Sequence, residues 1–346
     1  MITIQVRLLI ASLAVSLAVG PPCSAAAGEA PSYQVTKTVP LGAPDRWDYV
    51  VFDAPSHRVY VAHGDRVTVV DGLDGTVIGQ VEGYPGGTHG TAIVARLGVG
   101  FTDDGKAGEA GSFDLKTFKP VKRIKAAEDA DGMVFDPISG HVFVINGDTG
   151  TVTVIDPKQQ RAVANLQGGG KLEAAVAGND GKLYVNGAAN SEIVRIDTHS
   201  NQVDARWPIP DCKSPHGIAI DHAGRRLFSS CVNQVLVVVN LDSGATVATL
   251  PIGAGTDSAA FDPRRKLIFS ANGRDGTLSV IEEKDPQSFL ALPSVKTTVS
   301  ARTMDIDPVS GRIYLVAADT DATTANGGKP SVVPGSLKLM FMDPAQ

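Results

Sequence analysis

Aromatic side chains and long apolar runs are scarce in this chain of 346 residues. Phe, Trp and Tyr together make up 5% of the sequence, which is too few for a surface that stacks the bases of single-stranded nucleic acid. The formal net charge is −6, so no excess of positive charge attracts nucleic acid or anionic lipid. We therefore expect no nucleic-acid partner.

Common catalytic and cofactor motifs are also missing. The sequence contains no HExxH, GxSxG, CxxCH or GxxxxGK[ST] pattern, so it lacks the local signatures of zinc proteases, α/β-hydrolases, covalently attached haem and phosphate loops. Residues 168–171 read GGGK but lack the Ser or Thr that a phosphate loop needs. A third possible function, that of a redox partner protein, therefore has no cofactor-attachment sequence to support it.

The first 27 residues have the pattern of a cleaved secretory signal peptide. Arg7 precedes an apolar run over residues 8–19, which is followed by Pro21, Pro22 and three small residues that end at Ala27. The run is shorter than the roughly 20 residues of a membrane-spanning helix. We expect residues 1–27 to be removed and a mature chain without a transmembrane segment, residues 28–346, to reach the periplasm or the medium.

Only three cysteines are present, and Cys23 lies in the expected signal peptide. Cys212 and Cys231 remain in the mature chain. Two cysteines in an oxidising compartment commonly pair, and the alternative is two buried free thiols. We expect a disulfide.

A short apolar stretch that ends in Asp, Asn or Glu recurs about every 42 residues. Six stretches have this spacing, residues 67–71, 110–114, 152–156, 193–197, 236–240 and 278–282, and a seventh, residues 339–343, follows after a longer interval near the C-terminus. Each repeat reads as four strands, which in the third repeat are residues 133–136, 141–145, 151–156 and 162–166. Short β-branched runs separated by Asn, Asp, Gly and Pro are typical of strands and hairpins. The pattern predicts an all-β, seven-bladed β-propeller with four antiparallel strands in each blade, and a stacked solenoid is the alternative.

The two ends of the chain predict how the ring closes. The last repeat stops at Asp343, before a fourth strand, and residues 34–41 near the N-terminus have the form of an unpaired strand. We expect this N-terminal strand to complete the last blade, which removes two exposed sheet edges. The same repeat contains a long segment from Ala317 to Gly335, which is either a flap at one end of the channel or a surface insertion.

The repeats resemble a known family. Residues 58–81 (RVYVAHGDRVTVVDGLDGTVIGQV), 141–166 (HVFVINGDTGTVTVIDPKQQRAVANL) and 182–203 (KLYVNGAANSEIVRIDTHSNQV) are similar to the YVTN repeat of bacterial YncE-like seven-bladed propellers. DCKSPHGIAID followed by FSSCVNQ resembles the paired-cysteine blade of a subgroup. The resemblance implies an exported, often periplasmic protein with no generally assigned reaction. Related propellers carry redox cofactors, metal sites or binding surfaces.

Aligning the first strands of the repeats selects one polar residue from each blade. These residues are Asp48, His89, Asp131, Glu173, His216, Asp257 and Arg302. First strands line the channel of a propeller, so all seven should face one opening. Four carboxylates then meet one arginine and two histidines, and such an excess raises carboxylate pKa values or attracts a cation. Polar residues are also ordinary at a wet channel mouth, so a hydrated ring without a ligand is the alternative.

Two hypotheses for function follow from this ring. The first is an exported, monomeric binding or scaffold module, with a small ligand or a periplasmic protein at the channel mouth. Trp47 beside Asp48 would contact that ligand or else pack between blades. The second is a divalent-metal-dependent lyase or lactone hydrolase. Its ion, such as zinc or manganese, would be held by His89, Asp131, Glu173 and His216.

Overall fold

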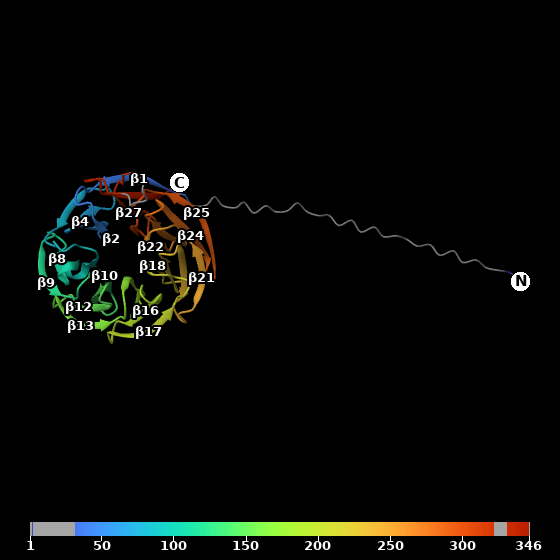
Figure 1. Cartoon of the computed structure of the whole chain (residues 1–346), viewed down its shortest axis with the longest axis horizontal. Coiled ribbons are helices and arrows are strands. Elements are labelled where there is room, and N and C mark those ends of the chain that lie inside the picture. The colour runs from blue at the N-terminus through green and yellow to red at the C-terminus, as the bar shows by residue number, and fades with distance from the viewer. Residues whose placement is uncertain (1, 3–31, 322–330, 346) are drawn as a thin grey trace. The chain divides into compact units, whose positions relative to one another are not determined.

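Seven antiparallel sheets of four strands each form the structure. The computed structural model describes residues 2, 32–321 and 331–345. In the unit Pro31–Gln346, the first strands contact one another in the cyclic order β2, β6, β10, β14, β18, β22, β26 and back to β2. First strands such as β2, β10, β18 and β22 lie toward the centre of the ring, and fourth strands such as β9, β13, β17 and β21 form its rim (Figure 1). The predicted seven-bladed β-propeller is confirmed.

The first four blades contain four consecutive strands each. They are β2 (Trp47–Asp53), β3 (Arg58–His63), β4 (Arg66–Asp71) and β5 (Val77–Val81); β6 (Thr91–Val94), β7 (Val99–Asp104), β8 (Glu109–Asp114) and β9 (Pro120–Lys125); β10 (Ala130–Asp136), β11 (His141–Asn146), β12 (Thr151–Asp156) and β13 (Arg161–Gln167); and β14 (Leu172–Ala177), β15 (Lys182–Gly187), β16 (Glu192–Asp197) and β17 (Gln202–Pro208). Two short 3-10 helices, η1 (Ala95–Leu97) and η2 (Gly105–Ala107), flank β7.

The remaining strands form the last three blades. They are β18 (Pro215–Asp221), β19 (Arg226–Cys231), β20 (Val235–Asn240) and β21 (Thr246–Pro251); β22 (Thr256–Asp262), β23 (Leu267–Asn272), β24 (Thr277–Asp285) and β25 (Ser288–Lys296); and β26 (Thr303–Ile306), β27 (Ile313–Ala317), β28 (Lys338–Pro344) and β1 (Tyr33–Pro40). Strand β1 pairs with β28 antiparallel, from Tyr33 opposite Pro344 to Pro40 opposite Lys338. The N-terminal strand therefore closes the last blade, as predicted.

The Asp or Asn at the end of the third strand forms a turn in each of the first five blades. Asp71 Oδ1 accepts hydrogen bonds from the amides of Leu73 and Asp74, at 2.8 and 3.1 Å. The carboxylates of Asp114, Asp156 and Asp197 and the amide oxygen of Asn240 accept equivalent bonds. Such Asx turns connect the third strand to the fourth. The sixth blade differs from the repeat, because β24 continues past Glu282 to Asp285.

Apolar side chains fill the space between neighbouring blades. Seven hydrophobic clusters are present among the described residues, and each joins two adjacent sheets. Second strands are the most buried, as in β19, where all six residues are buried. Fourth strands such as β9 are mostly exposed. Burial is therefore greatest at the second strands, in the interior of each blade, while the first strands are partly open to the channel and the fourth strands are exposed at the rim.

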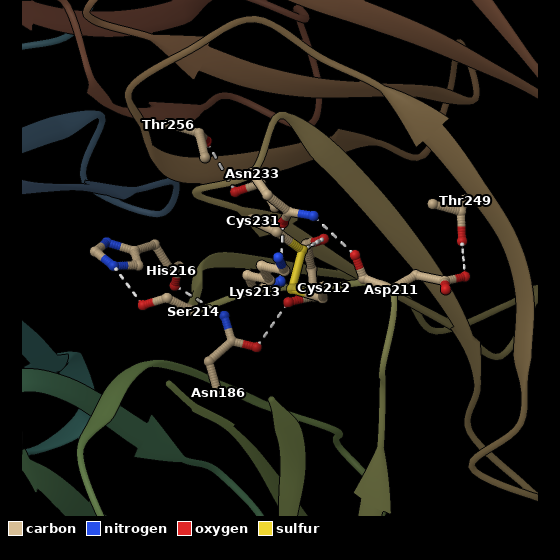
Figure 2. Close-up of a disulfide and its surroundings, with 12 residues drawn as sticks. Asn186, Asp211, Cys212, Lys213, Ser214, His216, Cys231, Asn233, Thr249 and Thr256 are labelled. Carbon is tan, nitrogen blue, oxygen red and sulfur yellow. Dashed lines mark hydrogen bonds between the residues drawn. A yellow bond between two sulfur atoms is a disulfide. The ribbon is translucent and has the colours of Figure 1, made fainter. Parts of the chain in front are cut away.

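Cys212 and Cys231 form the predicted disulfide, with 5.4 Å between their Cα atoms. It connects the segment that precedes β18 to the end of β19 in the fifth blade (Figure 2). Both cysteines are fully buried. The bridge therefore fixes the chain just before the inner strand of this blade.

Two predicted features lie wholly or partly outside the residues that the structure describes. The signal-peptide prediction, residues 1–27, lies outside the described residues apart from residue 2, and so do residues 322–330 of the segment between β27 and β28. The described ends of that segment form a bridge between Thr320 and Val332. Its last part contacts the connection between β1 and β2, where Asp45 Oδ1 accepts the amide of Leu337 at 3.0 Å. Within residues 32–321 and 331–345, no helix has the length and apolar character to cross a membrane.

Candidate functional site

The seven predicted residues form one ring at the channel mouth, and β-bulges aim most of them. The strand register shifts between Trp47 and Val50, Ala130 and Met133, Leu172 and Ala175, Pro215 and Ile218, and Thr256 and Ser258. The ring residues skipped by the pairing are Asp48, Asp131, Glu173, His216 and Asp257. A bulge redirects a side chain away from the regular alternation of a strand. The backbone thus presents these groups to the channel.

Small residues allow the bulged strands to approach one another. A Cβ atom on Gly217 would lie 2.4 Å from the backbone of Ser258 in the next blade. A Cβ atom on Gly90 would lie 2.4 Å from the backbone oxygen of Asp131. Only glycine fits at such distances. The two His-Gly pairs, His89-Gly90 and His216-Gly217, are thus part of how the ring is built.

On one side of the ring, His216 contacts three neighbours. Its Nδ1 atom lies 3.0 Å from Asp257 Oδ1, its Nε2 atom lies 3.3 Å from Ser214 Oγ, and Glu173 Oε1 is 3.9 Å from Nε2. Burial opposes the charged imidazole, but the hydrogen bond to Asp257 and the charge of Glu173 outweigh it, so the pKa of His216 is raised.

Two cations complete this side. Arg302 Nε donates to Asp257 Oδ2 at 2.8 Å, and Lys171 Nζ lies 3.3 Å from Glu173 Oε1. Burial would raise the pKa of Asp257, but the hydrogen bond from His216 and the charge of Arg302 hold it below its usual value. Asp257 is therefore the ionised carboxylate of the ring.

On the other side, His89 is bound by a different set of groups. Its Nδ1 atom lies 2.7 Å from Asp103 Oδ2, and its Nε2 atom lies 3.1 Å from an Arg46 guanidinium nitrogen. Asp103 is fully buried and also accepts the amides of His89 and Gly90, at 2.9 and 2.8 Å. Burial opposes the charge on His89, but Asp103 and Asp48 together raise its pKa.

Between the two histidines lie carboxyls that have no paired cation. Neither Asp48 nor Asp131 forms an ion pair with any residue in the described ranges. Burial, followed by the charge of Asp257, raises the pKa of Asp48 to about 7. Burial and the charge of Asp48 raise the pKa of Asp131 well above its usual range. Burial also raises the pKa of Glu173. The ring thus holds more carboxyls than it can keep ionised.

A cavity of about 260 Å³ continues from the ring into the channel. All seven first strands line it, mostly with apolar groups such as Val51, Met133 and Ile218. Asp305 is the acidic group deeper in its wall, where it accepts the amides of Phe52 and Ile306 at 2.8 Å each. Burial raises the pKa of Asp305 to about 6. A ligand at the ring would thus have an apolar space below it.

Trp47 lies away from the open mouth. Its side chain is 4% exposed and belongs to the hydrophobic cluster between the last and first blades. The Arg302 guanidinium lies 4.6 Å from the centre of its ring, and an Arg302 amino group donates to the Trp47 carbonyl at 2.9 Å. The indole therefore supports Arg302 and packs between blades, which is the second role considered for it.

The four predicted metal ligands are not gathered around one point. Across residues 32–321 and 331–345, no group of three or more His, Cys, Asp or Glu side chains is arranged to hold a metal ion. Glu173 and His216 approach each other, whereas His89 is engaged by Asp103 and Arg46. Metal binding at the ring stays a prediction.

Sequence reasoning assigned no role to Ser214, Lys171, Tyr49 and Asp305, which the structure places at the ring or in the cavity. The amide of Tyr49 donates to the His89 carbonyl at 3.2 Å. Burial and the carboxyls of the ring raise the pKa of the Tyr49 phenol well above its usual value. A polar residue within three positions of a ring residue is the signal that could have found all four.

Comparisons with known proteins agree with this architecture. No family model matches the chain. An uncharacterized protein YncE of Salmonella typhimurium is 25% identical over 190 residues, which cover 52% of this chain and 53% of that protein. The match to YncE of Salmonella typhi is 24% identical over the same length. The matched region thus spans about half the length of these curated relatives.

Two further similarities concern the fold. THO complex subunit 3 of Arabidopsis thaliana is 25% identical over 252 residues, which cover 66% of this chain and 72% of that protein. The solved structure of Kuenenia stuttgartiensis hydrazine synthase superposes with a TM-score of 0.70 at 14% identity, over 80% of this chain and 93% of that chain. At this identity the superposition shows the fold alone. The seven closed blades and these similarities show a seven-bladed β-propeller, and the YncE matches show that its sequence is similar to that of YncE.

Proposed function

We propose that this propeller is an exported binding module that holds a small, positively charged ligand at its channel mouth. The observation that carries the proposal is the charge of the ring. Asp48 and Asp131 have no paired cation among the described residues, and burial and the charges of neighbouring carboxyls raise their pKa values. A bound cation would relieve that repulsion and release protons.

The disulfide supports the exported part of the proposal. Disulfides persist in oxidising compartments and are rare in the cytosol. The Cys212–Cys231 bridge lies next to the ring. An oxidising compartment, in which this bridge forms, would therefore also keep the channel mouth in its described geometry. The alternative function, metal-dependent catalysis, has no gathered ligand set among the described residues to favour it.

The test compares ligands that differ in charge but not in size. Butylamine, 1-butanol and butyrate should be added to the purified protein at pH 8 and the thermal midpoint recorded, because a ligand of the folded state raises it. The amine should raise the midpoint, and the alcohol and the acid should not. Equal shifts for all three, or a shift with butyrate alone, would contradict a site for cations.

Matched variants locate the site. Asp48→Asn with Asp131→Asn removes two carboxyls from the ring, and the amine effect should disappear. Glu82→Gln with Glu128→Gln removes the same number of carboxyls from exposed positions that precede first strands, and the amine effect should persist. If both pairs reduce the effect equally, the amine responds to net charge rather than to the ring.

A further inference from the structure

Ser214, His216 and Asp257 are arranged as a nucleophile, a base and an acid. Ser214 Oγ lies 3.3 Å from His216 Nε2, and His216 Nδ1 lies 3.0 Å from Asp257 Oδ1. Figure 2 shows the Ser214 hydroxyl directed at the imidazole. This is the order of contacts by which hydrolytic serine enzymes activate a hydroxyl, and it is recognised by geometry rather than by sequence position.

The hydrogen bonds are consistent with the tautomer that such a site needs. Asp257 accepts the proton on His216 Nδ1, which leaves Nε2 as an acceptor. The Ser214 hydroxyl can then donate to Nε2. Arg302 Nε holds the second oxygen of Asp257 at 2.8 Å, so this carboxylate stays ionised and oriented. Asp257 and Arg302 are positioning residues.

The backbone around Ser214 is fixed by several contacts. Ser214 has a φ of 47°, which is uncommon for a residue with a side chain. The disulfide lies two residues before it, and the Lys213 amide donates to Asn233 Oδ1 at 2.8 Å (Figure 2). Asn186 Nδ2 donates to the His216 carbonyl at 2.8 Å. The serine and the histidine, two residues apart, are thus held in place from two strands.

The surroundings leave room for a substrate. The Ser214 and His216 side chains are both partly exposed at the channel mouth. Asp257 also lines the apolar cavity of about 260 Å³, which is large enough for a short acyl chain. Glu173 connects a cation to this site. Its Oε1 atom lies 3.9 Å from His216 Nε2 and 3.3 Å from the Lys171 ammonium.

We propose that Ser214 is an acyl-accepting nucleophile and that the site hydrolyses small carboxylic esters. The Ser214 oxygen forms a bond to the ester carbonyl carbon while His216 Nε2 takes its proton. The carbon–alkoxide bond then breaks, and the alcohol leaves with that proton. Water attacks the acyl-serine, gives its proton to His216, and the carboxylic acid leaves as Ser214 recovers its hydrogen.

Labelling of the full folded protein with a neutral alkyl fluorophosphonate tests the proposal. The Ser214 oxygen displaces fluoride from phosphorus, and peptide mass spectrometry locates the adduct. Ser214 should be labelled, Ser214→Ala should carry no adduct at this peptide, and heat-denatured protein should not react. Ser243→Ala, which removes an exposed serine from a turn of the same blade, should label like the parent. No adduct on Ser214 in the folded parent would overturn the proposal.

Hydrolysis of p-nitrophenyl acetate separates activation from mere exposure of the serine. His216→Gln should lower the rate by about 10²-fold or more, because no base then accepts the proton. Asp257→Asn should lower it by a comparable factor and change the pH profile, because the amide favours the wrong imidazole tautomer. Rates that do not change in either variant would show that Ser214 is not activated. Circular dichroism confirms that each variant is folded.

The two proposals fail separately. The fluorophosphonate and the acetate ester carry no charge, so their reaction does not depend on a cation site. Labelling of Ser214 without a butylamine effect would support the nucleophile and contradict the cation site. A butylamine effect without labelling would do the opposite.

Discussion

Each of the two histidines of the channel mouth has a carboxylate beside its Nδ1 atom, but the group beside its Nε2 atom differs. His89 is held by buried Asp103, and its Nε2 faces the Arg46 guanidinium at 3.1 Å. His216 is held by partly exposed Asp257, and its Nε2 faces the Ser214 hydroxyl at 3.3 Å. A guanidinium cannot give up a proton near neutral pH, whereas a hydroxyl can pass one to imidazole. The contacts of His89 therefore only fix its imidazole in place, whereas the imidazole of His216 can accept a proton from Ser214.

The supports of the two halves also differ. His89 is fixed by packing, because Asp103 accepts three hydrogen bonds and Gly105 lies against the imidazole. His216 depends on a covalent bridge two residues before Ser214. The two histidines occupy equivalent positions in their blades, but dense packing fixes His89 and a cross-link supports His216. Each support gives a way to change one half alone.

The largest effect is expected from the disulfide. Replacing both Cys212 and Cys231 by Ala removes a cross-link that spans 19 residues, and the free energy of unfolding should fall by about 3 kcal/mol. The contacts of Ser214 and His216 should weaken as well, while those of His89 remain. Urea unfolding measures the first effect, and imidazole NMR signals of the two histidines measure the second. Equal changes at both histidines would show that the bridge stabilises the whole ring.

The next effect concerns Asp48, whose charge contributes to the raised pKa of His89. The folded state keeps a proton on Asp48 up to about pH 7, whereas the ordinary pKa is 3.8, so its contribution to stability falls as pH rises through this window. Asp48→Asn should therefore be more stable than the parent by about 1–3 kcal/mol at pH 8 and nearly equal to it at pH 3. The pKa of His89 should fall too, because Asp48 contributes to raising it.

Denaturation curves at the two pH values check the stability change, and Glu82→Gln is the exposed control. A gain of equal size at pH 3 and pH 8 would mean that the variant acts through packing. If the variant is less stable than the parent at pH 8, Asp48 has a cationic partner in solution.

Packing of the His89 half can be tested at Gly105. A Cβ atom there would lie 2.5 Å from His89 Cε1 and 3.1 Å from the Ala130 carbonyl. Gly105→Ala should cost about 1–2 kcal/mol and displace His89 from Asp103, while His216 is unaffected. Gly132→Ala is the matched control, because its Cβ would make only an ordinary contact of 3.5 Å with Ile145. Thermal unfolding and the His89 NMR signals give the readout, and an unchanged His89 would show that the imidazole can move aside at no cost.

The contrast between the halves also shows what sequence could predict. The strand order, the closure by β1 and the disulfide follow from patterns that recur or from the pairing of the last two cysteines. The ring residues were found because each blade repeats the same alignment. Nothing in a repeat says which side chains meet, so neither the contact of Asp103 with His89 within one blade nor that of Asp257 with His216 across two blades could be predicted.

Single positions were harder still. Ser300 stands at the same place in the last repeat, two residues before Arg302, and only the distance to His216 gives Ser214 its role. Trp47 looked equally suited to a ligand or to the core, and burial between two blades decided the question. The bulges that aim the ring depend on the close approach of neighbouring strands at Gly90 and Gly217, which a sequence read one blade at a time does not reveal.

The smallest effect, and the most direct comparison of the halves, is expected from Arg46→Ala. The guanidinium lowers the pKa of His89 while Asp103 and Asp48 raise it, so its removal should raise that pKa further. Arg46 is exposed, so solvent screening should keep this change in the pKa of His89 small, and smaller still at high salt. NMR titration of both imidazoles measures it, with His216 as the internal control. A fall in the pKa of His89 would mean that Arg46 mainly orders the imidazole against Asp103. A rise confined to His89 would show that Arg46, the group at its Nε2, lowers the proton affinity of this imidazole. At His216 the group at Nε2 is Ser214, and we infer that this hydroxyl gives its proton to the imidazole.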